Sequence, residues 1–433
     1  MKKYYLNVNL SLSIISILRF RLIDKSLSMR LLYNSILSVA AFAVLLAACS
    51  SKANNDKITT PAAATAPPLN TKVLLAYNPK NADKQIDEVM QKLHQTRGFN
   101  GNVLVAKHGK IIYEKAIGWA DYLHRDSLKI NSQFELASVS KTMTSTAILL
   151  LMERGKLKLD DDVKKFFPDF PYDGVTIRLL LTHRSGLMNY VYFTDDIYRK
   201  EHRDERKGIT NAQEMALIAQ YKPARFNKPD VRFLYNNSNF MVLGSIIEKV
   251  SGMPYADFMK QNVFIPAGMT HTAVYSKAVY DKIPVDVVGH DRGQWRYSVA
   301  QNFLDGPVGD KGVYSTVGDL FLFDRALRAG RLLKKATMDS AYTPRNPWLH
   351  GHFNYGYGWR IFEAPGQQVI YHTGWWHGFR HIYLRDMKND IVIVLLTNLS
   401  NGSLLKLDDL FIAAGMPIVR KSAYKGNGDT SDD

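Results

Sequence analysis

The stretch Phe134-Glu-Leu-Ala-Ser-Val-Ser-Lys141 places a serine, Ser138, three residues before a lysine. The segment from Lys141 to Arg154 is rich in apolar residues and is followed by Gly155, which predicts a helix that begins close to Ser138. Residues three apart lie on the same face of a helix, so the lysine amine would be within reach of the serine hydroxyl. A serine hydroxyl becomes an effective nucleophile when a neighbouring base removes its proton. The simpler alternative is that Ser138 only caps the helix.

The serine–lysine spacing is not specific by itself, because Ser403-Leu-Leu-Lys406 and Ser422-Ala-Tyr-Lys425 share it. Two other strings, Tyr235-Asn-Asn237 and His372-Thr-Gly374, supply the context. In chain order, Ser138-Val-Ser-Lys141 and these two strings resemble the S-x-x-K, Y-x-N and K-T-G motifs of the penicillin-recognising serine hydrolases, which include the serine β-lactamases and the penicillin-binding proteins. The order of the motifs carries the resemblance more than any one motif does.

The surrounding sequence is similar to one branch of this superfamily, which contains class C β-lactamases, D-amino acid peptidases and family VIII-type carboxylesterases. Four stretches carry the similarity: Phe134–Lys141, Leu180–Leu187, Phe233–Asn239 and Gly312–Thr316. The similarity extends over roughly residues 81 to 415. It implies a β-lactamase/transpeptidase-like fold.

The resemblance also implies roles for individual residues. Ser138 would be the nucleophile of an acyl-enzyme reaction, with Lys141 and Tyr235 as its proton relay. The backbone N–H groups of Ser138 and Trp375 would form the oxyanion hole. The residues expected to bind the substrate are Asn237, His372, Thr373, Gly374 and Trp375.

Three departures from the family pattern bear on the substrate. His372 replaces the lysine of K-T-G, and a histidine is largely neutral above its reference pKa of about 6.5, so recognition of a substrate carboxylate should be weaker. Trp375-Trp376 places bulk where relatives often have small residues, and Pro229-Asp230 stands where Pro-Gly is usual. We therefore expect short-chain esters to be hydrolysed faster than β-lactams.

Strand-forming segments lie at both ends of this region. Asn102–Ala106 and Ile111–Lys115 flank a turn that contains Gly109, which predicts a β-hairpin. The C-terminal strands are expected at Tyr355–Phe362, Val369–Tyr371, Arg380–Leu384 and Ile391–Leu396. Between the two groups the pattern is mostly helical, as in Met241–Val250 and Asp319–Leu327. The sequence therefore predicts an α+β fold, in which an antiparallel sheet formed from both chain ends is flanked by helices and carries a mostly helical inserted lobe.

The single cysteine, Cys49, excludes an internal disulfide framework. It follows an apolar run, Ile36–Ala48, that is too short to span a bilayer and ends in Leu46-Ala-Ala-Cys49, which resembles a bacterial lipobox. A basic start at Met29 precedes this run, so we expect translation to begin there.

These features predict four segments along the chain. Residues 1–48 would be a signal region, 49–80 a lipidated N-terminus with a flexible tether, 81–415 the hydrolase domain, and 416–433 a polar tail. The expected location is the bacterial cell envelope, with the chain lipid-anchored and either facing the periplasm or in the outer membrane.

The chain is basic, with 56 Lys and Arg against 40 Asp and Glu, a net charge of +16. A basic surface favours anionic partners such as phosphorylated lipids or cell-wall polymers. We expect no nucleic-acid partner, because the chain has no compact Lys/Arg block and an envelope protein rarely meets nucleic acid. The expected partners are a small-molecule or peptide substrate, with cell-wall peptides among the options, and the membrane through the N-terminal lipid.

Several other residues are of types that occur in functional sites. His350-Gly-His352, His377 and His381 have no carboxylate or cysteine at ligand spacing, so we expect neither a metal site nor another cofactor. His183 is expected to order a loop. Lys311 could contact a substrate carboxylate, although an exposed lysine is the default expectation.

The sequence therefore predicts an envelope lipoprotein whose serine hydrolase domain forms an acyl-enzyme with an ester or amide substrate. Two alternatives stay open at this point. One is a cell-wall DD-peptidase or a β-lactamase, and the other is a catalytically idle relative that binds a cell-wall peptide.

Overall fold

The computed structural model of the chain describes residues 67–419, apart from 292, 294–296, 348, 350–351 and 365. The chain divides into two units, Met1–Pro61 and Ala62–Asp433, and every described residue belongs to the second unit. The predictions of a signal region and of lipidation at Cys49 therefore lie outside the described residues. His350 of the histidine group and most of the polar tail also lie outside them.

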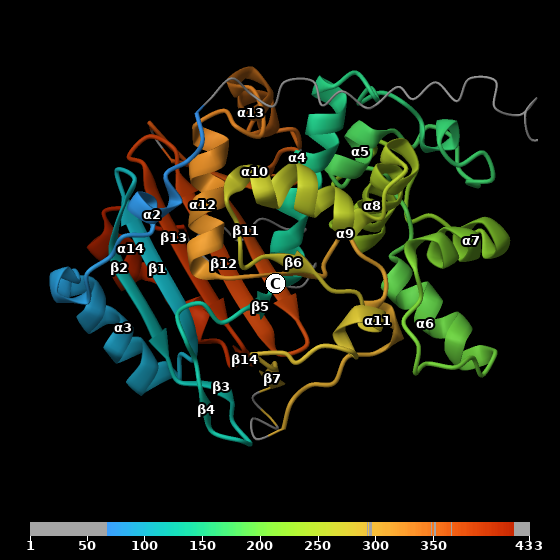
Figure 1. Cartoon of the computed structure of the whole chain (residues 1–433). Helices are drawn as coiled ribbons and strands as arrows, with labels where there is room; N and C mark the ends of the chain where they lie inside the picture. The colour runs from blue at the N-terminus through green and yellow to red at the C-terminus, as the bar shows by residue number, and fades with distance from the viewer. Residues whose placement is uncertain are drawn as a thin grey trace, which may run out of the picture. The chain divides into compact units, whose positions relative to one another are not determined.

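A seven-stranded antiparallel sheet forms the centre of the described unit (Figure 1). Its order is β2-β1-β13-β12-β11-β10-β9, so the first hairpin of the domain lies beside one of its last strands. β1 pairs with β13 from Gly101 opposite Thr397 to Lys107 opposite Ile391. This pairing confirms the predicted sheet built from both chain ends. The strands are β1 (Gly101–Lys107), β2 (Lys110–Ile117), β9 (Phe353–Tyr355), β10 (Arg360–Ala364), β11 (Gln367–Trp376), β12 (Phe379–Asp386) and β13 (Ile391–Thr397).

The segment Tyr355–Phe362, predicted as one strand, is divided between β9 and β10 by a turn, so this prediction was wrong. Two glycines make the turn possible. A Cβ at Gly356 would lie 2.1 Å from the carbonyl oxygen of Ala341, and Gly358 has a φ of +74°. The aromatic residues around these glycines favour a strand by propensity, and this preference concealed the turn.

Helices cover both faces of the sheet because its central strands are apolar on both sides. In β1, Val103 and Val105 pack into one core and Leu104 and Ala106 into the other. The first core is covered by α3 (Lys84–Arg97) and α14 (Asp408–Ala414). The second is covered by α12 (Val317–Arg328), which crosses the sheet in Figure 1.

The predicted helical lobe lies between the two groups of strands in sequence. Its longest helices, α4 (Ser140–Glu153) and α8 (Asn237–Ser251), are almost wholly buried and pack on each other. The remaining helices of this region are α5 (Ile177–Leu181), α6 (Tyr190–Lys200), α7 (Asn211–Tyr221), α9 (Tyr255–Met259), α10 (Ile265–Ala267), α11 (Lys277–Tyr280) and α13 (Lys335–Ala341). The short strands are β3 (Trp119–Asp121), β4 (Asp126–Ser127), β5 (Phe134–Glu135), β6 (Ala273–Val274), β7 (His290–Asp291), β8 (Val313–Ser315) and β14 (Leu399–Ser400).

The chain is already folded ahead of residue 81, where the tether was expected to continue. A short helix, α2 (Thr71–Leu74), precedes the domain, and Leu69, Leu74 and Tyr77 pack against the core. The average composition of residues 49–80 concealed these few apolar side chains. Among the described residues, none of the helices combines the length and the apolar character needed to cross a membrane.

Candidate active site

Ser138 lies in a single 3-10 turn, Ala137–Val139, that leads directly into α4. Ala137 has a φ of +49°, which is uncommon for a residue with a side chain. Strand β11 approaches this turn at Gly374, where a Cβ would lie 2.4 Å from the carbonyl oxygen of Leu136. Strained backbone of this kind is concentrated at functional sites. The turn therefore holds Ser138 between the start of α4 and the edge of β11.

Lys141 lies one helical turn after Ser138 and is completely buried. Its Nζ donates to Ser138 Oγ at 2.9 Å, to Asn237 Oδ1 at 2.9 Å and to the carbonyl oxygen of Asp310 at 3.0 Å. The three acceptors come from three segments that are far apart in the sequence. The structure thus brings together the first two motifs, at Ser138, Lys141 and Asn237.

The environment of Lys141 disfavours its charged form. Burial lowers the pKa of the Lys141 amine to about 7, with Asp310 acting in the opposite direction and Lys311 and Arg360 reinforcing the decrease. At neutral pH a large fraction of this lysine is therefore uncharged and able to accept a proton. A neutral amine 2.9 Å from a serine hydroxyl has the geometry of a general base.

Tyr235 lies immediately before α8, with its ring centroid 5.1 Å from Lys141 Nζ. The His183 ring packs on it at 4.4 Å between centroids. His183 Nδ1 also accepts the Asn236 N–H at 3.2 Å and lies 2.9 Å from Asn239 Nδ2. His183 therefore orders the loop that carries Tyr235, in agreement with the sequence expectation.

His372, the residue that replaces the family lysine, is fully buried in β11. Its Nε2 lies 3.0 Å from the hydroxyl of Tyr355, and its Nδ1 lies 2.7 Å from the carbonyl oxygen of Thr373. Both ring nitrogens thus have partners within the protein. Because the Tyr355 hydroxyl also lies 3.3 Å from His183 Nε2, the His372 imidazole is connected through Tyr355 to the histidine that packs on Tyr235.

The two tryptophans after Gly374 have different surroundings. Trp375 is 47% exposed, and the Arg380 guanidinium of β12 lies 4.1 Å from its ring. Trp376, the next residue along the strand, donates its Nε1 hydrogen to Asp305 and lies against Lys311. The Trp375 side chain therefore stacks on Arg380 at the surface. The indole that contacts Asp305 and Lys311 beside the site is that of Trp376.

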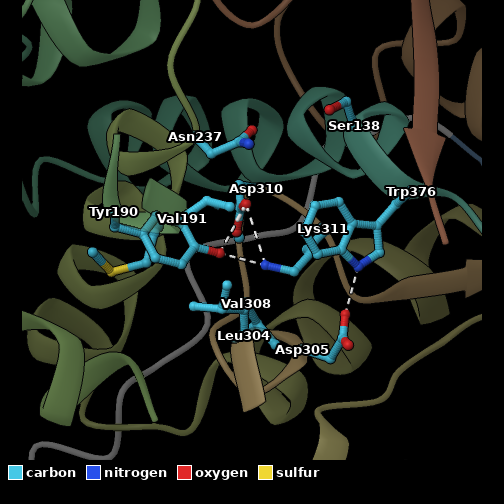
Figure 2. Close-up of polar contacts among 12 residues, drawn as sticks. Ser138, Tyr190, Val191, Asn237, Leu304, Asp305, Val308, Asp310, Lys311 and Trp376 are labelled. Carbon is cyan, nitrogen blue, oxygen red and sulfur yellow. Dashed lines mark hydrogen bonds and ion pairs between the residues drawn. The ribbon is translucent and has the colours of Figure 1, made fainter. Parts of the chain in front are cut away.

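Lys311 is buried, so the expectation of an exposed lysine was wrong. It is 4% exposed, donates to the hydroxyl of Tyr190, and has its Nζ 3.4 Å from Asp310 Oδ2 (Figure 2). Tyr190 also donates to Asp310 Oδ2, at 3.1 Å. The flanking Gly309, with a φ of +111°, was a sequence signal for a constrained loop at this position, but a lysine between glycines ordinarily indicates a turn at the surface.

Two further charged groups in this region, Arg360 and Asp305, were not found by sequence reasoning. The Arg360 guanidinium, at the start of β10, lies 5.2 Å from the Tyr235 ring centroid. His377 Nε2 lies 2.9 Å from Asp305 Oδ2. Burial acts to raise the pKa of Asp305, but the hydrogen bond and charge of His377, the charge of Lys311 and the hydrogen bond from Trp376 together outweigh it and lower the pKa. Within the described part of the chain, no three His, Cys, Asp or Glu side chains are grouped so that they could hold a metal ion.

Comparison with known proteins identifies the family of the chain. The family model described as Beta-lactamase matches residues 85–415. A penicillin-binding protein from Bacillus subtilis (strain 168) is 34% identical over 336 residues, which covers 74% of this chain and 72% of that protein.

Two solved structures of similar fold can be compared with this chain. The penicillin binding protein from Bacillus halodurans has a TM-score of 0.65 and 25% identity, covering 75% of this chain and 98% of that one. The D-amino acid amidase from Ochrobactrum anthropi SV3 has a TM-score of 0.62 and 22% identity over 77% of this chain and 96% of its own, a likeness of fold.

The fold and the serine–lysine pair thus define a serine hydrolase of the penicillin-recognising type. The chain belongs to the β-lactamase family, as the match over most of the described domain shows.

Proposed function

We propose that the chain hydrolyses an ester or amide through an acyl-enzyme on Ser138, with Lys141 as the base. The observation that supports this most directly is the 2.9 Å contact between Lys141 Nζ and Ser138 Oγ, made by a lysine whose pKa burial lowers to about 7. The idle alternative is less favoured, because a binding protein has no need for a buried lysine that is poised to lose its proton.

In the proposed reaction, neutral Lys141 removes the proton of Ser138 while Oγ attacks the carbonyl carbon of the substrate. The backbone N–H groups of Ser138 and Trp375 stabilise the oxyanion of the tetrahedral intermediate. Tyr235 donates a proton to the leaving group as its bond to carbon breaks, and regains a proton from Lys141. A water molecule then attacks the acyl-enzyme by the same steps and releases the acid.

We further propose that Asn237, Thr373 and Gly374 line the substrate channel, with Asn237 also fixing Lys141. Short-chain esters should be better substrates than β-lactams, because His372 has both nitrogens engaged within the protein and offers no permanent charge to a substrate carboxylate. The second candidate is a peptidase that acts on cell-wall peptides or a β-lactamase. It is favoured by the similarity to a Bacillus subtilis penicillin-binding protein.

The experiment is intact-protein mass spectrometry after exposure to a fluorophosphonate and to a panel of β-lactams, together with turnover of 4-nitrophenyl butyrate. Ser138→Ala should abolish labelling and reduce turnover by at least about 10³-fold. Ser403→Ala is the matched control, because Ser403 begins a second S-x-x-K string and should leave both readouts unchanged.

Near-normal ester turnover by folded Ser138→Ala protein would refute the proposal. A kcat/KM for nitrocefin above that for the butyrate ester would instead promote the β-lactamase alternative.

We also propose that Cys49 carries a lipid that anchors the chain to the bacterial envelope, on the basis of its lipobox-like context. Cys49→Ser should move the protein from the membrane fraction to the soluble fraction. Unchanged fractionation would contradict the anchor.

A further inference from the structure

Lys311 is a buried cation that the reaction proposed above does not use. Its ammonium is anchored by the hydroxyl of Tyr190 and the carboxylate of Asp310. It also lies 5.1 Å from the ring centroids of both Tyr190 and Trp376, which is within cation–π range. Figure 2 shows the ammonium between these two aromatic side chains. A long, flexible side chain is thereby held in one place.

The anchored lysine adjoins the catalytic centre through the main chain. The carbonyl of Asp310, the residue bonded to Lys311, accepts the hydrogen bond from Lys141 Nζ at 3.0 Å. The side chains of Asp310 and Lys311 both contact Tyr190 at the start of α6. These contacts fix the orientation of the peptide group that faces Lys141.

Other titratable groups also lie around Lys311 and Lys141. Glu135 on β5 and Glu214 on α7 are buried, and burial raises the pKa of each carboxyl well above its usual range, so both are largely neutral at pH 7. Asp305 is paired with His377. The positive charges of Arg360 and Lys311 both lower the pKa of Lys141, and the negative charge of Asp310 raises it. Asn237, the side chain of α8 that contacts Lys141, carries no charge.

We propose that Lys311 is a positioning residue for Lys141: it holds the Asp310 carbonyl against the lysine amine and, as a fixed positive charge, favours the uncharged form of Lys141. The inference rests on the proposed function, because it concerns the base of that reaction. With 4% of its surface exposed, Lys311 acts within the protein rather than on the substrate carboxylate considered from the sequence.

The test compares Lys311→Met with Lys311→Arg, and measures kcat/KM for 4-nitrophenyl butyrate across the pH range on both sides of neutrality. In Lys311→Met a like charge is lost and Asp310 is left uncompensated, so both changes raise the pKa of Lys141. The acid limb of the profile should move upward by at least about one pH unit, the size expected for a unit charge about 12 Å away at an effective dielectric constant of about 20 and exceeded for a nearer charge. Lys311→Arg keeps the charge and should keep the midpoint.

Lys335→Met is the control, since Lys335 is an exposed lysine that forms an ion pair with Asp339 at the surface. A purely structural role for Lys311 would lower the plateau of the profile without moving its midpoint, and that result would overturn the proposal. If Lys311→Met melts early, Lys311→Gln replaces it, because an amide can still bond to Tyr190 and Asp310.

A second measurement separates this inference from the proposed function. In ¹³C-lysine-labelled Ser138→Ala protein, the Lys141 resonance should titrate at a higher pH when Lys311→Gln is added, whatever the enzyme hydrolyses. An unmoved Lys141 titration would refute the role of Lys311. A wild-type chain without Ser138-dependent turnover would refute the proposed function alone.

Discussion

Asp324 and Asp310 are both buried aspartates, but their surroundings differ. Both carboxylate oxygens of Asp324 accept hydrogen bonds, from Arg325, Arg328 and Arg385. Burial acts to raise its pKa, yet the three guanidinium groups outweigh burial and lower it to about 2. Asp310 has one oxygen, Oδ1, without a hydrogen-bond partner among the described residues, and its ammonium partner Lys311 is 3.4 Å from the other.

The difference shows that burial of charge does not by itself indicate function. The arginine cluster around Asp324 joins α12 to strand β12 and to Asp390 at the turn before β13, and it is expected to contribute to stability alone. The group around Asp310 has incomplete pairing beside a lysine with a lowered pKa, which is the pattern of a reaction centre.

The largest expected effect is on the arginine cluster around Asp324. Asp324→Asn leaves the buried Arg385 and the partly buried Arg325 and Arg328 without their shared carboxylate, and should lower the free energy of unfolding by about 3–5 kcal/mol. Urea unfolding measures this, and kcat/KM of the folded fraction should stay unchanged. Asp339→Asn removes an exposed ion pair with Lys335 and should cost about 1 kcal/mol or less. An equal loss of unfolding free energy in the two variants would show that the arginine cluster around Asp324 contributes no more than a surface ion pair.

A smaller effect is expected from Asp310→Asn, which keeps the carbonyl that faces Lys141 but removes the charge. Since the carboxylate raises the pKa of Lys141, its loss should lower that pKa, and the acid limb of kcat/KM should move to lower pH by about one unit. The direction is opposite to that for Lys311→Met. The loss of stability should be smaller than for Asp324→Asn, because an asparagine oxygen can still accept from Tyr190. A shift toward higher pH would contradict the electrostatic account.

The smallest effect concerns Glu135, whose pKa is raised by burial, with the charge of Asp305 adding to the increase. Above pH 4.5, the usual pKa of a glutamate carboxyl, Glu135 keeps its proton in the native state and loses it in the unfolded state. The free energy of unfolding therefore decreases as the pH rises from about 4.5 through the raised pKa of Glu135. Glu135→Gln mimics the neutral form and should flatten the decrease of Tm between about pH 5 and pH 8. An unaltered slope would show that Glu135 is ionised in the folded chain.

Much of the fold could be predicted because its signals are local. The hairpin around Gly109, the strand Ile391–Thr397 and the start of α4 each depend on the pattern of a few neighbouring residues. The turn at Gly356 could not be predicted in this way. Its close approach to Ala341 exists only once β9 and α13 have packed together.

The candidate site was partly predictable for a similar reason. Ser138 and Lys141 are fixed by one helix, whereas the burial of Lys311 depends on Tyr190 and Trp376, which come from distant parts of the chain. The partners of His372 are likewise set by Tyr355 on another strand. Motif order indicates which segments meet, but the charges that surround them follow from tertiary contacts.

The pairing of β1 with β13 has a consequence for folding kinetics. Gly101 and Thr397 are opposite each other, yet almost the whole domain lies between them in sequence. The loop-closure entropy of such a contact must be overcome before the sheet is complete, and contacts of high sequence separation slow folding. On the ribosome, β1 and β2 emerge long before their neighbour exists. During synthesis, one edge of this hairpin therefore stays unpaired until β13 has been made.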